Sequence, residues 1–178
     1  MCVFDAGNGQ VSDGLRCWDY CVAQGAQILS NSWGASSHVV AMDSAIAAVT
    51  SSGALVVCSA GNDGVDVDTT PHYPSSYAEN NAQVISVAAS DASNNLWLRS
   101  NYGVKGGVTL AAPGVELLGL GLAGLYGKST GTSMSSKSQY TSIPCHRYST
   151  PPPCMQLTRS FLLHRSPAGC RGRCLAVR

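Results

Sequence analysis

The sequence predicts an α/β protein with a parallel sheet, because apolar runs of strand length alternate with segments of helical pattern. The apolar runs lie at residues 26–31, 54–58, 83–89 and 108–111. Those at 54–58 and 83–89 lack the polar alternation of a half-exposed strand, which indicates burial on both faces. Helical apolar patterns at 13–24 and 39–51 separate the earlier runs. We therefore expect helices on both faces of the sheet.

The first 31 residues are expected to contain a strand end, a helix and a strand. Val3-Phe4 is typical of the end of a short buried strand, and the glycine-rich residues 7–9 follow it as a turn. Ser12 or Asp13 can cap a helix that runs to about residue 24, where Gly25 suits its end. The run at 26–31 is the next strand.

The following segment repeats this order. Ser36 or Ser37 is the expected cap of a helix over about 39–51, which Gly53 ends. The remaining strands of the sheet follow, and a glycine-rich stretch then leads from the last of them to Ser133.

Residues that can carry chemistry follow the strands. Ser32-Trp33-Gly34 comes directly after the strand at 26–31, and Ser59-Ala60-Gly61-Asn62 ends the strand at 54–58. In open α/β sheets, sites form beyond the carboxyl ends of the strands. Ser133 stands in a small-residue loop that leads into a helix, which is how several hydrolases present a nucleophile. A serine that merely caps a helix is the alternative.

Six short motifs occur in a definite order: Asn31-Ser32-Trp33-Gly34, Ser59-Ala60-Gly61-Asn62, Tyr73-Pro74-Ser75-Ser76-Tyr77, Ser100-Asn101-Tyr102-Gly103, Ala111-Ala112-Pro113-Gly114 and Gly131-Thr132-Ser133-Met134-Ser135. This series resembles the C-terminal half of the catalytic domain of subtilisin-like serine proteases (peptidase S8). The resemblance covers residues 1–136. It implies a subtilisin-like parallel sheet and serine endopeptidase activity on polypeptide substrates.

The resemblance also implies a role for each motif. Ser133 would be the nucleophile, and the side-chain amide of Asn62 would stabilise the oxyanion together with the backbone N–H of Ser133. The substrate-binding residues would be a strand edge and two walls of a side-chain pocket: Ser32, Trp33 and Gly34 for the edge, and Ser59, Ala60, Gly61 and His72 for the walls. Three alternatives stay open, namely a turn role for Asn62, a core position for Trp33 and an exposed loop position for His72.

No segment matches the family's catalytic aspartate or histidine. Asp5 imitates the aspartate motif, but the family order is Asp, His, Ser, and no histidine occurs between residues 5 and 31. None of the four histidines is a substitute for the base. His38 lies in an expected helix cap, His72 lies in a pocket loop, and His146 and His164 lie in the tail. We therefore expect an incomplete domain, a fragment that lacks its base and is inactive alone. A non-catalytic peptide-binding module is the alternative.

Composition and charge exclude several classes of partner. The chain is 44% hydrophobic and 12% charged with a net charge of +1, which predicts a compact core and neither a nucleic-acid nor a membrane partner. No apolar run approaches a bilayer span, and no export signal is visible. No cofactor is expected, although Asp63, Asp66 and Asp68 form a loop suited to calcium. The oligomeric state and the localisation stay open. For the localisation, the family resemblance implies a secreted or endomembrane protein.

Residues 137–178 differ sharply in composition from residues 1–136. The first part holds four basic and ten acidic residues, whereas the second holds seven basic residues, no acidic ones and five of the eight prolines. We expect the basic tail to be unstructured and the helix that follows the serine in the family to be missing. Two alternatives for the tail stay open. One is a disulfide module of Cys145, Cys154, Cys170 and Cys174. The other is a zinc site of Cys145, His146, Cys170 and Cys174.

Overall fold

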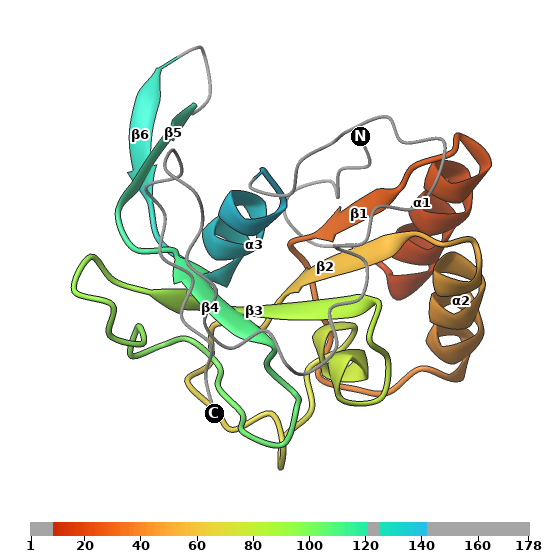
Figure 1. Ribbon diagram of the computed structural model, residues 1–178, viewed down its shortest axis with the longest axis horizontal. Coiled ribbons are helices and arrows are strands. Elements are labelled where there is room, and N and C mark those ends of the chain that lie inside the picture. Colours follow the sequence, from red (N-terminus) through yellow and green to blue (C-terminus); the bar gives the residue numbers. More distant parts are fainter. Residues whose placement is uncertain (1–8, 121–124, 142–178) are drawn as a thin grey trace, which may run out of the picture.

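A four-stranded parallel sheet forms the centre of the computed structural model, which describes residues 9–120 and 125–141 (Figure 1). The strands lie side by side in chain order: β1 (Ile28–Asn31), β2 (Leu55–Ser59), β3 (Val84–Ser90) and β4 (Leu110–Pro113). Ile28 pairs with Leu55, and Val57 pairs with Ile85. Every residue of β3 is buried, as expected for a strand covered on both faces. The predicted α/β class and parallel sheet are confirmed.

Helices α1 (Val11–Ala23) and α2 (Val40–Ser51) pack against each other and cover one face of the sheet (Figure 1). Their apolar side chains form one core cluster with those of the strands: Trp18, Met42, Ile46, Val49, Val56, Cys58 and Val84 among others. The short 3₁₀ helix η2 (Ser75–Glu79) contributes Tyr77 and Ala78 to the edge of this cluster. Burial of these side chains holds the two helices against the strands and so fixes the positions of β1 and β2, whose ends carry candidate site residues.

Helix α3 (Thr132–Thr141) covers the opposite face of the sheet. A Cβ atom added to Gly114 would lie 2.0 Å from Ser135 Oγ on α3 and 2.8 Å from the Ala89 side chain on β3. Ala89 is an odd number of residues from Val84 of the α1–α2 cluster, so the two side chains point to opposite faces. Helices on both faces are thus confirmed, but our expectation that the helix after the serine is missing is wrong.

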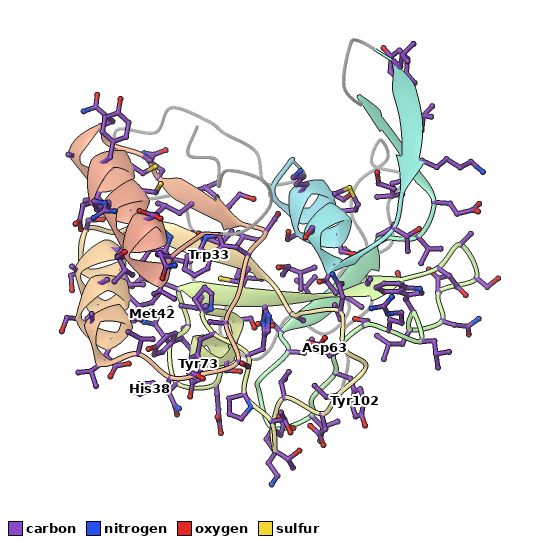
Figure 2. All side chains as sticks on the ribbon, turned by 180° about the vertical axis from the view of Figure 1, so that it is seen from behind. Trp33, His38, Met42, Asp63, Tyr73 and Tyr102 are labelled. Carbon is purple, nitrogen blue, oxygen red and sulfur yellow. The ribbon has the colours of Figure 1, made fainter. Side chains whose placement is uncertain are left out.

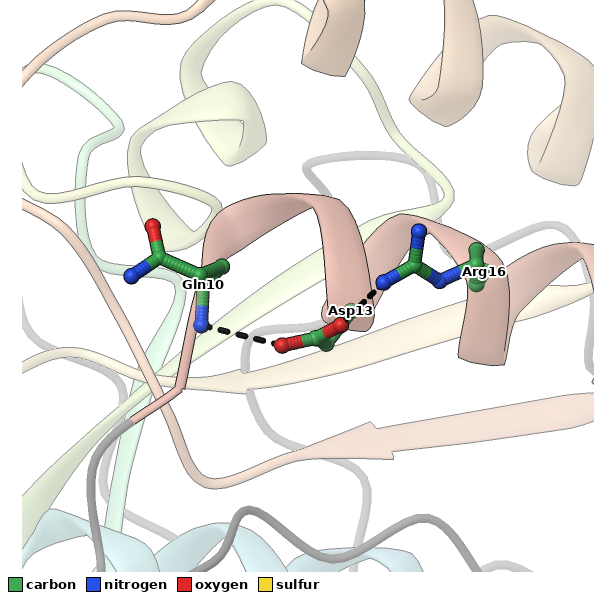
Figure 3. Close-up of polar contacts among 3 residues, drawn as sticks. All are labelled: Gln10, Asp13 and Arg16. Carbon is green, nitrogen blue, oxygen red and sulfur yellow. Dashed lines mark hydrogen bonds and ion pairs between the residues drawn. The ribbon is translucent and has the colours of Figure 1, made fainter.

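The start of α1 differs from the sequence prediction. The N-cap is Gln10 and not Ser12 or Asp13. Asp13 lies in the first turn, where its carboxylate accepts the Gln10 N–H at 3.2 Å and pairs with Arg16 (Figure 3). The Arg16 hydrogen bond, and after it the Gln10 N–H, lower the pKa of Asp13. An acidic side chain in the first turn satisfies a free N–H and favours the helix dipole.

The start of α2 is set by packing and not by a serine cap. Its N-cap is Val39, which makes no side-chain cap bond, so the expected caps Ser36 and Ser37 are wrong. Val39 packs against the apolar cluster under α1 and α2, and this burial fixes the entry of the chain. Asp43 in the first turn binds both the Tyr77 hydroxyl, which joins η2 to α2, and the imidazole of His38, which precedes α2. These two bonds, that of Tyr77 first, lower the pKa of Asp43.

A hairpin that the sequence did not predict connects β4 to α3. Its antiparallel strands are β5 (Leu117–Leu120) and β6 (Tyr126–Ser129), which project from the body of the protein (Figure 1).

None of the described helices has the length and apolarity needed to span a bilayer. The predictions for Val3-Phe4 and for residues 142–178 concern positions outside the described residues. The division of the chain after residue 136 stays a prediction, and α3 continues beyond that point to Thr141.

Candidate active site

Ser133, the second residue of α3, lies against the end of β1. Its hydroxyl donates to the Ser32 carbonyl at 3.5 Å, and the Ser32 hydroxyl donates to the Ser133 carbonyl at 3.4 Å. The Ser136 hydroxyl, one turn further along α3, also donates to the Ser133 carbonyl at 3.2 Å. The fold therefore brings the expected nucleophile to the expected strand edge, although 101 residues separate them in the chain.

Thr132 fixes the side-chain amide of Asn62 in one orientation. The Asn62 Oδ1 atom accepts two hydrogen bonds of 2.9 Å, from the backbone N–H and from the hydroxyl of Thr132. The Thr132 Oγ1 atom in turn accepts the Gly61 N–H at 3.2 Å, and the residue is fully buried. Because two donors occupy Oδ1, the Nδ2 group of Asn62 is the end that stays available. The structure records no acceptor for it among the described residues.

The backbone N–H of Ser133 is a second available donor. It lies in the first turn of α3, where N–H groups have no partner within the helix. The Met134 N–H reaches the Gly131 carbonyl at 3.0 Å and the Thr132 N–H reaches Asn62, whereas no acceptor is recorded for the Ser133 N–H among the described residues. The positive end of the helix dipole adds to the attraction of this position for an anion.

The segment Ser59–Gly61 has buried side chains, and its backbone forms hydrogen bonds to β3 and to Asn101. The side chains of Ser59 and Ala60 are 4% and 0% exposed. The Ala60 N–H donates to the Val87 carbonyl at 3.0 Å, and the Ala60 carbonyl accepts from Asn101 Nδ2 at 2.9 Å. Because the side chains of Ser59 and Ala60 are buried, only the backbone of this segment can form a wall against a ligand.

The imidazole of His72 lies between the loops that follow β1 and β2. A Cβ atom added to Gly34 would lie 2.1 Å from ring atom Cε1, and one added to Gly61 would lie 3.2 Å from Cδ2. The Nδ1 atom hydrogen-bonds with the Ser75 hydroxyl at 3.1 Å. Burial lowers the pKa of His72, and the charge of Asp63 acts in the opposite direction. His72 is thus not an exposed loop residue, which removes one of the alternatives.

The side chain of Trp33 points into the core. Its ring packs against Trp18 with centroids 5.7 Å apart, and its Nε1 atom donates to Asn31 Oδ1 at 3.2 Å. Figure 2 shows Trp33 on the side of the molecule that carries α1 and α2, close to Met42. The core alternative therefore holds for the Trp33 side chain, and only its backbone remains for an edge with Ser32 and Gly34.

The described histidines are bonded elsewhere than to Ser133. His38 Nε2 lies 2.8 Å from Asp43 Oδ1, and its ring meets that of Tyr73 with centroids 5.3 Å apart (Figure 2). His72 bonds with Ser75. No hydrogen bond from a histidine to Ser133 is recorded in the described ranges. Asp5, His146 and His164 lie outside those ranges.

Two of the three aspartates considered for calcium, Asp66 and Asp68, accept hydrogen bonds from backbone N–H groups. The Asp66 carboxylate accepts the Asp68 N–H at 3.0 Å. The Asp68 carboxylate accepts the N–H groups of Val104 at 2.6 Å and Lys105 at 2.7 Å. No group of three or more His, Cys, Asp or Glu residues is placed to hold a metal ion in residues 9–120 and 125–141. Calcium at this loop was only an alternative to the expectation of no cofactor, and the contacts of Asp66 and Asp68 add no support for it.

The pKa of His72 predicts a pH dependence of stability. The folded protein lowers the pKa of His72 below the ordinary value of 6.5 and so favours the neutral imidazole. Its contribution to stability is therefore present above about pH 6.5 and is lost as the pH falls through the folded pKa. We expect the urea midpoint to fall between about pH 8 and about pH 5, and to fall less in His72→Gln. An equal decrease in His72→Gln would contradict a buried neutral imidazole.

Two residues that support the site were not singled out from the sequence. Thr132 orients Asn62, and Asn101 bonds to the loop that carries it. Both stand in motifs that the sequence displays, Gly131-Thr132-Ser133 and Ser100-Asn101-Tyr102-Gly103. The motifs marked these positions, but no local pattern in the sequence indicated that the two side chains bond to the Asn62 loop.

Comparison with known proteins identifies relatives over most of the chain. A family model described as the subtilase family matches residues 1–137. The thermophilic serine proteinase of Bacillus sp. (strain AK1) is 35% identical over 73% of this chain and 30% of its own length. The major intracellular serine protease of Bacillus subtilis (strain 168) is also 35% identical, over 73% of this chain and 40% of its own length.

Solved structures give the same result. The prenylagaramide maturation protease PagA has a TM-score of 0.65 and 25% identity, covering 75% of this chain and 48% of that one. A mutant of the protease domain of PatA has a TM-score of 0.62 and 25% identity, covering 71% of this chain and 46% of that one. The chain spans less than half the length of each of these relatives. With its motifs, its sheet and more than half of its residues matched, this chain belongs to the subtilase family.

Proposed function

We propose that this chain supplies the nucleophile, oxyanion and substrate-binding segments of a serine endopeptidase. The observation that carries the proposal is the pair of available donors beside Ser133: its own N–H and the Nδ2 group of Asn62. Donors placed before the reaction stabilise the negative charge that develops on a carbonyl oxygen under attack. The resemblance of the ordered motifs to serine proteases supports the same function.

In this mechanism Ser133 Oγ forms a bond to the carbonyl carbon of the peptide, and a histidine base takes its proton. The carbonyl oxygen becomes an oxyanion between the Ser133 N–H and Asn62 Nδ2. The C–N bond then breaks, and the base returns the proton to the leaving amine. Water, deprotonated by the same base, attacks the ester carbonyl and releases the acid and the Ser133 hydroxyl.

The substrate would bind as an added strand along the edge at Ser32–Gly34, where Gly34 allows close approach of a peptide backbone. The side chain before the scissile bond would then lie toward the gap between Gly34 and Gly61. The His72 imidazole occupies that gap and contacts both glycines. We propose on this basis a preference for small side chains at that substrate position.

The chain alone is proposed to be inactive because Ser133 has no base among the described residues. Without one, the hydroxyl stays a neutral and weak nucleophile. Activity then requires a segment that carries the family's aspartate and histidine. We define the complemented protein as this 178-residue chain joined to such a segment from a subtilase relative.

The function is tested by cleavage of peptide amides that differ only in the side chain before the scissile bond. We expect turnover by the complemented protein, faster for alanine than for phenylalanine at that position, and none by the 178-residue chain. Tight peptide binding without turnover in the complemented protein would instead indicate the non-catalytic peptide-binding module. Turnover with a preference for phenylalanine would contradict the proposed role of His72.

Thr132→Val tests how the oxyanion donor is held. Valine has the shape of threonine but lacks the hydroxyl that bonds Asn62 Oδ1 and Gly61. We expect kcat of the complemented protein to fall roughly 10-fold, because one of the two bonds that orient the amide is lost. The matched control is Thr50→Val, since Thr50 is a buried threonine whose hydroxyl, among the described residues, bonds within α2 and to Asn81 and not to the site. An equal loss of kcat in both variants would contradict the orienting role.

A further inference from the structure

Asn101 is a completely buried asparagine whose side-chain hydrogen bonds all go to the turn that carries Asn62. Its Nδ2 group donates to the Ala60 carbonyl at 2.9 Å. Its Oδ1 atom accepts the N–H groups of Asp63 at 2.9 Å and Val65 at 3.2 Å. One amide side chain therefore bonds the turn both before and after Asn62.

The backbone of Asn101 adds a further contact to the same turn. Its N–H donates to the Gly61 carbonyl at 3.0 Å. Gly61 has a φ of +107°, and a Cβ atom added there would lie 2.2 Å from Asn101 Nδ2. Both the left-handed conformation and the close approach require glycine at this position. The turn is therefore shaped around the Asn101 amide.

Asn101 is itself anchored to the sheet. The neighbouring Ser100 hydroxyl donates to the Asn101 carbonyl at 3.0 Å and accepts the N–H of Ala89, a residue of β3, at 2.9 Å. Asn62, by contrast, has no recorded backbone hydrogen bond among the described residues, and its side chain is held only by Thr132. The position of the Asn62 amide thus depends on the turn on one side and on Thr132 on the other.

We infer that Asn101 is the positioning residue that sets the oxyanion donor Asn62, by fixing the turn Ala60–Val65 against β3. The inference rests on the proposed function for its catalytic consequence, although the geometry stands without it. A misplaced donor stabilises the oxyanion less, so Asn101 acts on kcat through Asn62 and leaves peptide binding at the Ser32–Gly34 edge unchanged.

The first test uses amide NMR on the 178-residue chain, without any catalysis. We expect slow hydrogen exchange at the N–H of Asp63 although that residue is exposed, and one ordered pair of Asn62 side-chain amide signals. In Asn101→Ala these signals should broaden or shift. In Ser86→Ala they should keep their positions, because Ser86 is equally buried on β3 and its hydroxyl has no hydrogen-bond partner among the described residues. Fast exchange at Asp63 in the unaltered chain would overturn the inference even if Asn101→Ala failed to fold.

The second test is a double-mutant cycle in the complemented protein. We expect Asn101→Ala to lower kcat by more than about 10-fold with KM nearly constant, within the limit of roughly 10²- to 10³-fold for loss of one oxyanion donor. When Asn62 is already alanine, the same change should lower kcat by less than about 2-fold. Equal effects in both backgrounds would show a structural role only. If Ser133→Ala left the rate unchanged, the proposed function would fail, and the NMR result would still decide the positioning role.

Discussion

Ser133→Ala in the complemented protein should lower kcat by roughly 10⁶-fold, which is the loss measured when the nucleophile is removed from subtilisin itself. The reason is that alanine cannot form the acyl-enzyme, so only binding and oxyanion stabilisation remain. Steady-state kinetics on a peptide amide, with KM expected to change little, measures the effect.

Ser135→Ala is the matched control for that variant. Ser135 lies two residues further along α3 and is completely buried, and its hydroxyl has no hydrogen-bond partner among the described residues. Its removal breaks no bond, so we expect kcat to stay within about 2-fold of the unaltered protein. Full activity in Ser133→Ala would make this serine a helix cap and would contradict its role as nucleophile.

Asn62→Ala should have the second largest effect, a loss of roughly 10²- to 10³-fold in kcat, the range measured for the corresponding change in subtilisin itself. The loss is smaller than for Ser133 because the Ser133 N–H remains as a donor. The proposed peptide-binding edge at Ser32–Gly34 is unaltered in this variant, so we expect KM to be nearly constant.

Asn62→Asp separates the donor from the contacts that hold the loop. The carboxylate keeps an oxygen for the N–H and hydroxyl of Thr132, which Asn62 Oδ1 accepts in the unaltered protein, but it cannot donate. We expect the urea midpoint to be preserved better than in Asn62→Ala, while kcat falls at least as far. Activity near that of the unaltered protein would mean that Asn62 serves the turn alone.

The sequence predicted best those elements whose burial is continuous. The run at 83–89 corresponds to β3, Val84–Ser90, all of whose residues are buried. The run at 54–58 likewise corresponds to β2, Leu55–Ser59. Strands inside a doubly covered sheet need apolar residues at successive positions, and this requirement is visible in a local window.

The elements that the sequence missed lack a continuous apolar pattern of their own. Leu118 and Tyr126 of the β5–β6 hairpin are 71% exposed each, and glycines interrupt its apolar pattern. Helix α3 is rich in serine and carries no continuous apolar face, so it was not expected after Ser133. It forms where small side chains allow close packing on the sheet, at Ser135 against Gly114 and Ala89. Such tertiary contacts leave no local pattern.

The candidate site shows the same limit. The resemblance of the motifs indicated Ser133 and Asn62, and the fold brings both to the carboxyl ends of the strands. The residues that hold them were not predictable, because the bonds of Thr132 and Asn101 to the Asn62 loop join positions far apart in the chain. Trp33 was assigned to a substrate edge by its motif, yet its side chain packs on Trp18. Only the fold decides which way a side chain at a strand end points.

The most direct test of the account is fluorophosphonate labelling of Ser133, followed by mass spectrometry of the labelled peptide. A phosphonylated serine forms only when a base removes the hydroxyl proton and the oxyanion donors are in place. We expect a single label on Ser133 in the complemented protein, none in its Ser133→Ala variant and none in the 178-residue chain. Stoichiometric labelling of the 178-residue chain, or no label on Ser133 in a folded complemented protein, would contradict the account.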